Sequence, residues 1–234
     1  AGGGYAEYAA VPAGQVVHLP GGIDLTTAAG LIEVAATVVS NLTHVALLPG
    51  ETFLVHGGTG GIGSFAIQYA KTLGCKVITT AGSAEKLKIC LSLGADLALD
   101  YHDDWLAALL EHTKRRGVDV ILDVIGAKYL QANVSALALG GRLVIIGMQG
   151  GTKGTLDINR LLNKRALVTA TSLRFRPVAQ KAEICSTVER QIWPLYGNGQ
   201  IKAPPTTQFE LTEVAAAHRL LDSGDNVGKI VLTL

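Results

Sequence analysis

A glycine-rich segment between residues 52 and 63 is the part of this sequence best suited to chemistry. Gly58, Gly60 and Gly63 follow a short apolar run in the spacing G-x-G-x-x-G. In that spacing the first glycine permits a tight turn, the second lets the backbone approach a pyrophosphate, and the third lets a helix pack closely on a strand. The helix that follows offers free N–H groups to the phosphates. The spacing therefore predicts a dinucleotide-phosphate loop, and a flexible turn without a ligand is the alternative.

The residues after the next predicted strand indicate which dinucleotide is bound. An NAD-preferring site has Asp or Glu at the tip of that strand, where it binds the ribose 2′-hydroxyl. Here the strand is followed by Gly82 and Ser83, with Lys86 one helical turn further on. A 2′-phosphate would gain a hydroxyl donor, a helix N-terminus and an ammonium group. The sequence therefore predicts NADPH as the cofactor. In the alternative, Ser83 only caps a helix and Lys86 is only solvated, and Glu85 would oppose a phosphate if it pointed inward.

Other catalytic apparatus is absent from the sequence. No tyrosine is followed by lysine four residues later, no Cys or His pair has zinc-ligand spacing, and no G-x-S-x-G motif occurs. A hydride-transfer enzyme needs none of these, because the cofactor carries the chemistry and the protein supplies position and electrostatics. The histidines are scattered, and we expect each to be a surface or capped histidine rather than a metal ligand: His18, His44, His56, His102, His112 and His218.

These residues must be positioned by a regular alternation of strands and helices. Apolar runs without polar alternation indicate strands buried on both faces, and they alternate with helical patterns. Strands are predicted over residues 52–56, 75–80, 97–100, 119–124, 142–147 and 165–172. Helices are predicted over residues 63–72, 84–93, 104–112, 128–137 and 181–196. This rhythm predicts an α/β fold with a doubly wound, parallel, six-stranded Rossmann sheet.

The two ends of the chain do not continue this rhythm. Residues 6–17 are β-like and are interrupted by Pro12 and Gly14. After Pro204 and Pro205 the pattern predicts a strand over 207–210, a helix over 213–222 and a last strand over 229–234. We expect these ends to be two pieces of a second domain.

Composition excludes several classes of protein. The formal net charge is +1, which does not favour nucleic acid or an anionic membrane as a partner. The longest apolar run, residues 31–39, is interrupted by Glu33 and is shorter than the roughly 20 residues of a membrane span. Three irregularly spaced cysteines, Cys75, Cys90 and Cys185, indicate free buried thiols in a reducing compartment. We therefore expect a cytoplasmic protein.

Several strings of residues together resemble the zinc-free quinone oxidoreductase (zeta-crystallin-like) branch of the medium-chain dehydrogenase/reductases. These are residues 3–8, 34–37, 56–63, 80–83 with Lys86 and Leu87, 93–95, 117–123, 140–142 and 228–232. The resemblance implies a Rossmann domain preceded by a catalytic β-domain of GroES type, to which the C-terminus returns. On this basis residues 1–32 are the end of the catalytic domain, 33–202 the NADPH-binding domain and 203–234 the C-terminal return. Most of the catalytic lobe has no counterpart here, so we expect this chain to bind NADPH but to reduce quinones poorly.

The resemblance also implies which residues contact the cofactor. Thr59, Gly60, Gly61 and Ile62 would hold the pyrophosphate within the loop Gly58–Gly63, and Gly82, Ser83 and Lys86 would meet the 2′-phosphate. The remaining contacts would be Tyr101 at the adenosine ribose, Ile125 and Gly126 at the nicotinamide ribose, Gly147 and Met148 beside the nicotinamide, and Leu173, Arg174 and Arg176 in the loop after the sixth strand. Tyr101 is alternatively a surface tyrosine, and the two arginines are alternatively solvated loop charges.

The function implied by the resemblance is NADPH-dependent hydride transfer to a quinone or another conjugated carbonyl compound. Two alternatives remain open: an NADPH-binding protein with little turnover, and a reductase whose main substrates are alkenals or enones. Zinc-dependent relatives carry a ligand cysteine near Glu33, and none is present, so we expect no catalytic metal. Residues 165–172 form an apolar strand that would lie at the sheet edge, which predicts a homodimer through this strand.

Overall fold

The structure is a computed structural model and describes residues 3–19 and 22–234. Contacts within the chain divide it into two compact units. One unit is Ser40–Ser172, and the other combines the chain up to Val39 with Leu173–Leu234. The domain boundaries predicted from the family resemblance, at 1–32, 33–202 and 203–234, remain a prediction. The two compact units are defined by contacts within the chain and do not test those boundaries.

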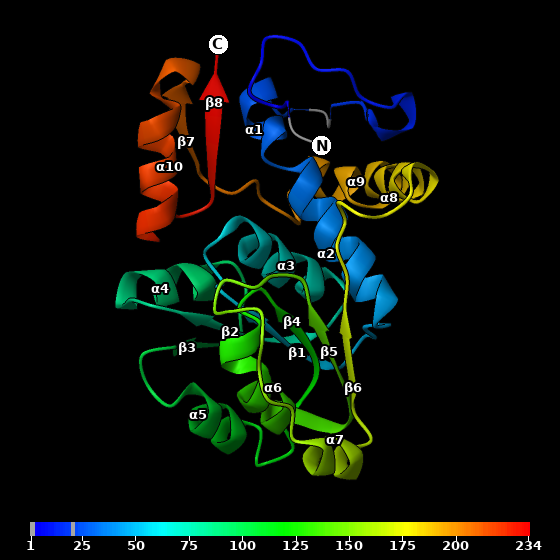
Figure 1. Cartoon of the computed structure of the whole chain (residues 1–234), viewed down its shortest axis with the longest axis vertical. Helices are drawn as coiled ribbons and strands as arrows, with labels where there is room; N and C mark the ends of the chain where they lie inside the picture. The colour runs from blue at the N-terminus through cyan, green and yellow to red at the C-terminus, as the bar shows by residue number, and fades with distance from the viewer. Residues whose placement is uncertain (1–2, 20–21) are drawn as a thin grey trace. The chain divides into compact units, whose positions relative to one another are not determined.

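The unit Ser40–Ser172 contains a parallel six-stranded sheet in the order β3-β2-β1-β4-β5-β6 (Figure 1). The strands are β1 (Thr52–His56), β2 (Lys76–Ala81), β3 (Leu97–Asp100), β4 (Val118–Asp123), β5 (Leu137–Ile145) and β6 (Leu167–Ala170). β1 and β4 are the central strands, and the chain crosses from one half of the sheet to the other between β3 and β4. The predicted doubly wound Rossmann sheet is confirmed.

Helices cover both faces of this sheet. α3 (Gly61–Thr72) and α4 (Ala84–Ser92) lie on one side, and α5 (Trp105–His112), α6 (Leu130–Ala136) and α7 (Ile158–Lys164) lie on the other (Figure 1). A short 3-10 turn, η2 (Ala127–Tyr129), precedes α6. Every residue of β4 is buried, as are the last four residues of β1 and the last five of β2. Burial on both faces explains why these strands are continuous apolar runs.

The other unit has its own secondary structure. Its elements are η1 (Ala13–Gln15), α1 (Leu25–Ala29), α8 (Val178–Gln191), α9 (Trp193–Gly197), β7 (Thr206–Glu210), η3 (Leu211–Glu213), α10 (Val214–Ser223) and β8 (Lys229–Thr233). β7 and β8 pair in parallel as a two-stranded sheet. α2 (Ile32–His44) belongs to this unit up to Val39 and to the other unit from Ser40.

The structure corrects some predicted elements. Residues 6–17 contain the turn η1 rather than a strand, because no described residue pairs with them and Pro12 has no N–H to donate. The helix predicted over 181–196 is two helices, and Pro194 stands in the first turn of the second one, where a missing N–H is tolerated. The strand predicted over 142–147 runs from Leu137 to Ile145, with a register shift opposite Val118 and Val120. Helix α7 was not predicted.

The stretch Leu25–His44, which comprises α1 and α2, is long and apolar enough to cross a membrane by length and composition. The uninterrupted apolar runs in the sequence had predicted no segment of that length. Of its most apolar window, 56% is buried inside the fold. Leu31, Val34 and Val38 are at most 1% exposed. These residues recur at helical spacing, which is the pattern of a helix that packs into a protein core.

Candidate cofactor site

The predicted phosphate loop connects β1 to α3. α3 begins at Gly61, and its N-cap residue Gly60 has no side chain to cap the helix. The first N–H groups of an α-helix have no partner within the helix, and here the N-cap residue makes no side-chain bond to them. Gly58 N–H donates to the Thr80 carbonyl (2.9 Å), which ties the loop to the end of β2. The loop therefore presents backbone donors at the carboxyl end of the central strand.

The glycines of the loop divide into two kinds. A Cβ atom on Gly63 would stand 2.2 Å from the Gly57 carbonyl oxygen, and one on Gly58 would stand 2.4 Å from Thr79 Oγ1 and 2.6 Å from Cys90 Sγ. Both positions are closed by the protein itself. A Cβ on Gly60 would meet only the Gly57 oxygen, at an ordinary 3.5 Å. Packing within the protein therefore does not require glycine at position 60, as expected of the glycine that a pyrophosphate approaches.

The structure brings Gly82, Ser83 and Tyr101 together at the tip of β2. Ser83 is the N-cap of α4, and its hydroxyl accepts the Lys86 N–H at 3.3 Å. Tyr101 follows β3, and a Cβ on Gly82 would stand 2.2 Å from its hydroxyl oxygen. The Tyr101 ring therefore packs on the Gly82 backbone beside the first turn of α4. Glu85 is exposed.

The loops after β4 and β5 are joined to each other by backbone hydrogen bonds. Gly150 N–H donates to the Ile125 carbonyl (2.7 Å), and Ala127 N–H donates to the Gly151 carbonyl (3.1 Å). A Cβ on Gly147 would stand 2.5 Å from the Val124 oxygen, so only glycine permits this approach. The predicted nicotinamide-side residues Ile125, Gly126, Gly147 and Met148 thus belong to one connected pair of loops. Gly126 adopts a φ of +79°, which favours glycine.

All these loops follow the carboxyl ends of parallel strands and therefore lie at the same edge of the sheet. They flank the boundary between β1 and β4, where the order of the strands reverses. Ligands of open α/β sheets bind at this position. Leu173, Arg174 and Arg176 follow β6 and belong to the other unit. Their predicted contact with the cofactor therefore remains a prediction.

His56 is not the surface or capping residue that the sequence suggested. It ends β1 with 1% of its surface exposed. Its Nε2 lies 2.8 Å from Asn133 Oδ1 and its Nδ1 lies 3.1 Å from Thr80 Oγ1. The rings of Trp105 and Tyr129 pack edge-on against it, at 5.0 and 4.8 Å between centroids. Burial lowers the pKa of His56 to about 4, so the ring is neutral in the folded protein.

Asp123 was also missed as a functional candidate. It ends β4 and is fully buried. Its carboxylate accepts the N–H groups of Ile125 (2.7 Å) and Gly126 (3.0 Å), two of the predicted nicotinamide-side residues. Burial raises the pKa of Asp123, and the two N–H groups act in the opposite direction. A buried acid at the end of an apolar strand, followed by glycine three residues later, was the available sequence signal.

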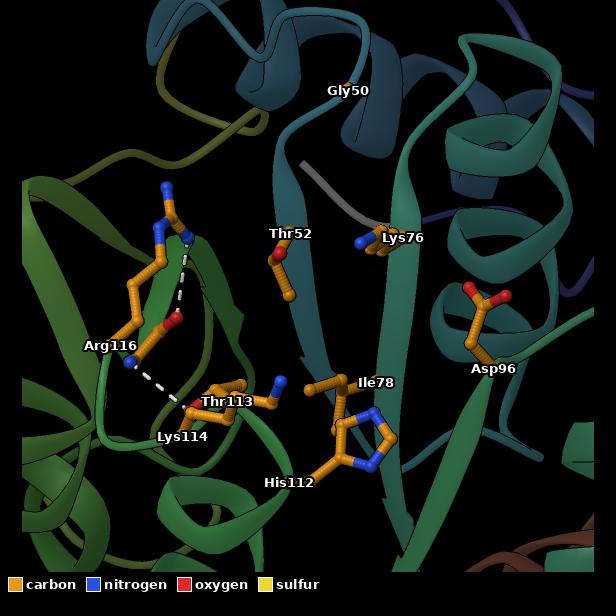
Figure 2. Close-up of a pocket in the computed structure, with 10 residues that line it drawn as sticks. Gly50, Thr52, Lys76, Ile78, Asp96, His112, Thr113, Lys114 and Arg116 are labelled. Carbon is orange, nitrogen blue, oxygen red and sulfur yellow. Dashed lines mark hydrogen bonds between the residues drawn. The ribbon is translucent and has the colours of Figure 1, made fainter.

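A separate hollow in this unit lies away from these loops (Figure 2). It measures about 690 Å³, and the residues that line it are Gly50, Thr52, Lys76, Ile78, Asp96, His112, Thr113, Lys114, Arg116 and Gly117. Thr52 and Lys76 are the first residues of β1 and β2. The hollow is therefore at the amino edge of the sheet, opposite the predicted cofactor loops. This hollow is therefore separate from the predicted cofactor site.

Among the described residues, no three His, Cys, Asp or Glu side chains gather into a group that could hold a metal ion. The three cysteines are free and buried, as predicted. Burial raises the pKa of Cys90, which touches the phosphate loop, to about 11. This thiol is therefore not a reactive nucleophile at neutral pH.

A doubly wound sheet with a glycine-rich loop at its reversal point is the architecture of the cofactor domain of dehydrogenases. A sequence profile described as zinc-binding dehydrogenase matches residues 61–184, more than half of the chain. The chain is 30% identical to a quinone oxidoreductase of Pseudomonas aeruginosa over 232 residues, which cover 98% of this chain and 71% of that protein. The chain therefore belongs to the zinc-binding dehydrogenase family, and its resemblance to quinone oxidoreductases is confirmed.

The chain is also similar to a protein of known structure and to a segment of a much longer enzyme. A mycobacterial protein solved in complex with NADPH superimposes with a TM-score of 0.89 and 30% identity, over 98% of this chain and 71% of that one. A highly reducing polyketide synthase of Aspergillus ruber is 35% identical over 96% of this chain. The chain spans only 10% of the length of that synthase.

The buried His56 predicts acid sensitivity. The unfolded chain takes up a proton at this histidine near pH 6.5, and the folded chain does so only near pH 4. The contribution of neutral His56 to the free energy of unfolding is therefore fully present above pH 6.5 and is lost as the pH falls toward 4. Between pH 7 and pH 5 the free energy of unfolding should fall by about 2 kcal/mol. Urea unfolding at both pH values measures it. His56→Gln should lose markedly less stability over this interval than the wild type, and equal losses would show that His56 does not titrate in this way.

Proposed function

We propose that this chain binds NADPH across the boundary between β1 and β4 and takes part in hydride transfer to a quinone or another conjugated carbonyl compound. The observation that carries the proposal is the open face of Gly60, because a glycine that no packing requires stands at the uncapped N-terminus of α3. The likeness to a mycobacterial protein solved with NADPH supports the choice of cofactor.

Each part of the site then has a task in binding. The N–H groups of the loop from Thr59 to Ile62 would hold the pyrophosphate, and Gly63 keeps α3 close enough for them to reach it. Ser83 and Lys86 would bind the 2′-phosphate, with Tyr101 beside the adenosine ribose. Residues 81–84, at the end of β2 and directly after it, include no Asp or Glu that would repel that phosphate.

The joined loops after β4 and β5 would position the nicotinamide end. When bound, NADPH supplies a hydride from its nicotinamide ring. Gly126 and Gly147 allow the two loops to approach without side chains, and Met148, which is 65% exposed, is available to cover the ring. The residues of this chain then act by orientation and by exclusion of water, rather than as an acid or base.

The acceptor is proposed to be a molecule with an electron-poor carbon, either a quinone or an α,β-unsaturated carbonyl compound. The likeness to a reducing polyketide synthase favours the unsaturated carbonyl as a second candidate. Oxidation of NADPH should be followed with a small para-quinone and with a 2-alkenal. Turnover of the quinone alone would indicate a quinone reductase, and turnover of the alkenal alone would indicate an alkenal reductase. Turnover of neither would indicate a protein that only binds NADPH.

We further propose that this chemistry needs no zinc and that the protein is cytoplasmic. The first proposal rests on the missing ligand cysteine near Glu33, and the second on three free thiols. Elemental analysis should find no stoichiometric zinc in the purified protein, and one zinc per chain would contradict the first proposal.

Substitution in the phosphate loop should separate binding from folding. Gly60→Val places a branched side chain in open space, so the unit should fold but lose NADPH binding. Gly63→Val forces side-chain atoms into the Gly57 backbone and should instead destabilise the fold by several kcal/mol. Circular dichroism and NADPH fluorescence measure the two effects. A folded Gly60→Val protein with wild-type affinity would show that the loop is not the site.

The β2 tip should determine cofactor preference. Lys86→Ala should weaken NADPH binding by about 10- to 100-fold, the scale of a lost hydrogen bond to a charged group, and should leave NADH unchanged. Lys88→Ala is the matched control, because Lys88 lies on the same helix and is exposed. Fluorescence titration of both cofactors is the measurement. Equal weakening of NADPH and NADH in Lys86→Ala would contradict the assignment.

We also propose that the protein is a homodimer formed through β6. This strand is at the edge of the sheet and pairs only with β5 among the described residues. Leu167 on the strand and Ile158 and Leu162 on α7 are 49–69% exposed, and such an edge favours pairing with a copy of itself. Sedimentation at micromolar concentration should give the mass of a dimer, and Leu167→Glu should shift it toward the monomer. A monomeric wild type would defeat the proposal.

A further inference from the structure

The carboxylate of Asp123 is at the centre of a buried polar arrangement below the nicotinamide-side loops. It is 0% exposed and lies at the carboxyl end of the central strand β4. Each of its two oxygens accepts a different backbone N–H group. Oδ1 accepts the Ile125 N–H at 2.7 Å, and Oδ2 accepts the Gly126 N–H at 3.0 Å. Two short hydrogen bonds to one charged acceptor are among the stronger interactions available to a loop.

The loop held in this way is also held from its other side. Gly126 has a φ of +79°, and a Cβ there would stand 2.9 Å from the Gly147 oxygen. Gly150 N–H donates to the Ile125 carbonyl (2.7 Å). The Ile125 peptide groups are therefore bonded on one side to Asp123 and on the other to the loop after β5. Contacts inside the protein therefore hold both loops.

A second layer of polar groups connects Asp123 to β1 and β2. The Nε2–H of neutral His56 donates to Asn133 Oδ1 (2.8 Å), and Thr80 Oγ1 lies 3.1 Å from Nδ1 of the same ring. With its oxygen bonded to His56, Asn133 is left with its amide N–H₂ group for Asp123. The Asn133 side chain acts on this carboxylate and lowers the pKa of Asp123, against the effect of burial.

We infer that Asp123 is a positioning residue that preforms the nicotinamide half of the site, while the adenosine half is formed separately by the β1 loop and the β2 tip. This inference rests on the proposed NADPH function. A carboxylate fits this position because the two N–H donors reach different oxygens. In an amide one of those two positions would be an NH₂ group, which donates and cannot accept. Asp123→Asn should therefore loosen the turn at Ile125 and Gly126 while the sheet stays folded.

The experiment compares NADPH with 2′,5′-ADP, which carries only the adenosine half of the cofactor. In Asp123→Asn, binding of NADPH should weaken about 10- to 100-fold, the range for a hydrogen bond to a charged group, and binding of 2′,5′-ADP should change less than about twofold. Asp104→Asn is the control, because Asp104 also accepts a backbone N–H, from Ala107 at 3.0 Å, outside the proposed site. It should leave both affinities unchanged.

A merely structural role would weaken both ligands alike, and that result would overturn the inference. Amide hydrogen exchange of the wild type without cofactor provides a second readout that needs no variant. The N–H groups of Ile125 and Gly126 should be protected before NADPH is added, and exchange there as fast as in an unstructured peptide would also overturn it. A wild type that binds neither ligand would contradict the proposed function itself. In that case, protection of the Ile125 and Gly126 N–H groups from exchange would still test whether they are bonded to Asp123.

Discussion

The closeness of α3 to the end of β1 is the constraint on which the rest of this structure depends. Gly63 is packed so tightly on Gly57 that one added carbon atom would stand 2.2 Å from a backbone oxygen. Because the helix starts this close to the strand, its first N–H groups reach the edge where the order of the sheet reverses. Gly60 lies between Gly58 and Gly63, which are both tightly packed, whereas a Cβ on Gly60 would meet only the Gly57 oxygen, at 3.5 Å. Tight packing on either side thus creates the open position that a phosphate group would occupy.

The same edge of the sheet is built differently on its two sides. On the β2 side, small residues and a tyrosine shape the surface, and Ser83 both caps α4 and faces the position proposed for the 2′-phosphate. On the β4 side, a buried carboxylate and backbone hydrogen bonds between loops determine the shape. Burial of this carboxylate carries a desolvation cost, which the two N–H donors and the Asn133 side chain oppose. Each half of the site therefore has its own support.

Much of this could be predicted from the sequence, because the signals are local. The glycine spacing predicted the loop, and the uninterrupted apolar runs predicted a parallel sheet buried on both faces. The capping role of Ser83 followed from its position before a helical pattern and is confirmed. The expected free thiols are also confirmed.

The remaining features depend on contacts that no local pattern contains. His56 looked like a scattered surface histidine, because its partners Thr80 and Asn133 are 24 and 77 residues away in the sequence. Asp123 lay inside the strand predicted over 119–124, and its role appears only when the following loop folds back over it. Helix α7 has a short pattern, and its apolar residues Ile158 and Leu162 are exposed rather than buried, so the periodicity gave little signal.

The central claim is that NADPH binds at the carboxyl edge of the sheet, over the loop of Gly60. A crystal structure of the chain grown with NADPH tests it most directly. The account predicts the pyrophosphate against the backbone N–H groups of residues 59–62 and the 2′-phosphate beside Ser83 and Lys86. The hollow at the opposite edge of the sheet is also lined by cationic side chains, among them Lys76 and Lys114. Cofactor bound there, or no bound cofactor at saturating concentration, would contradict the account.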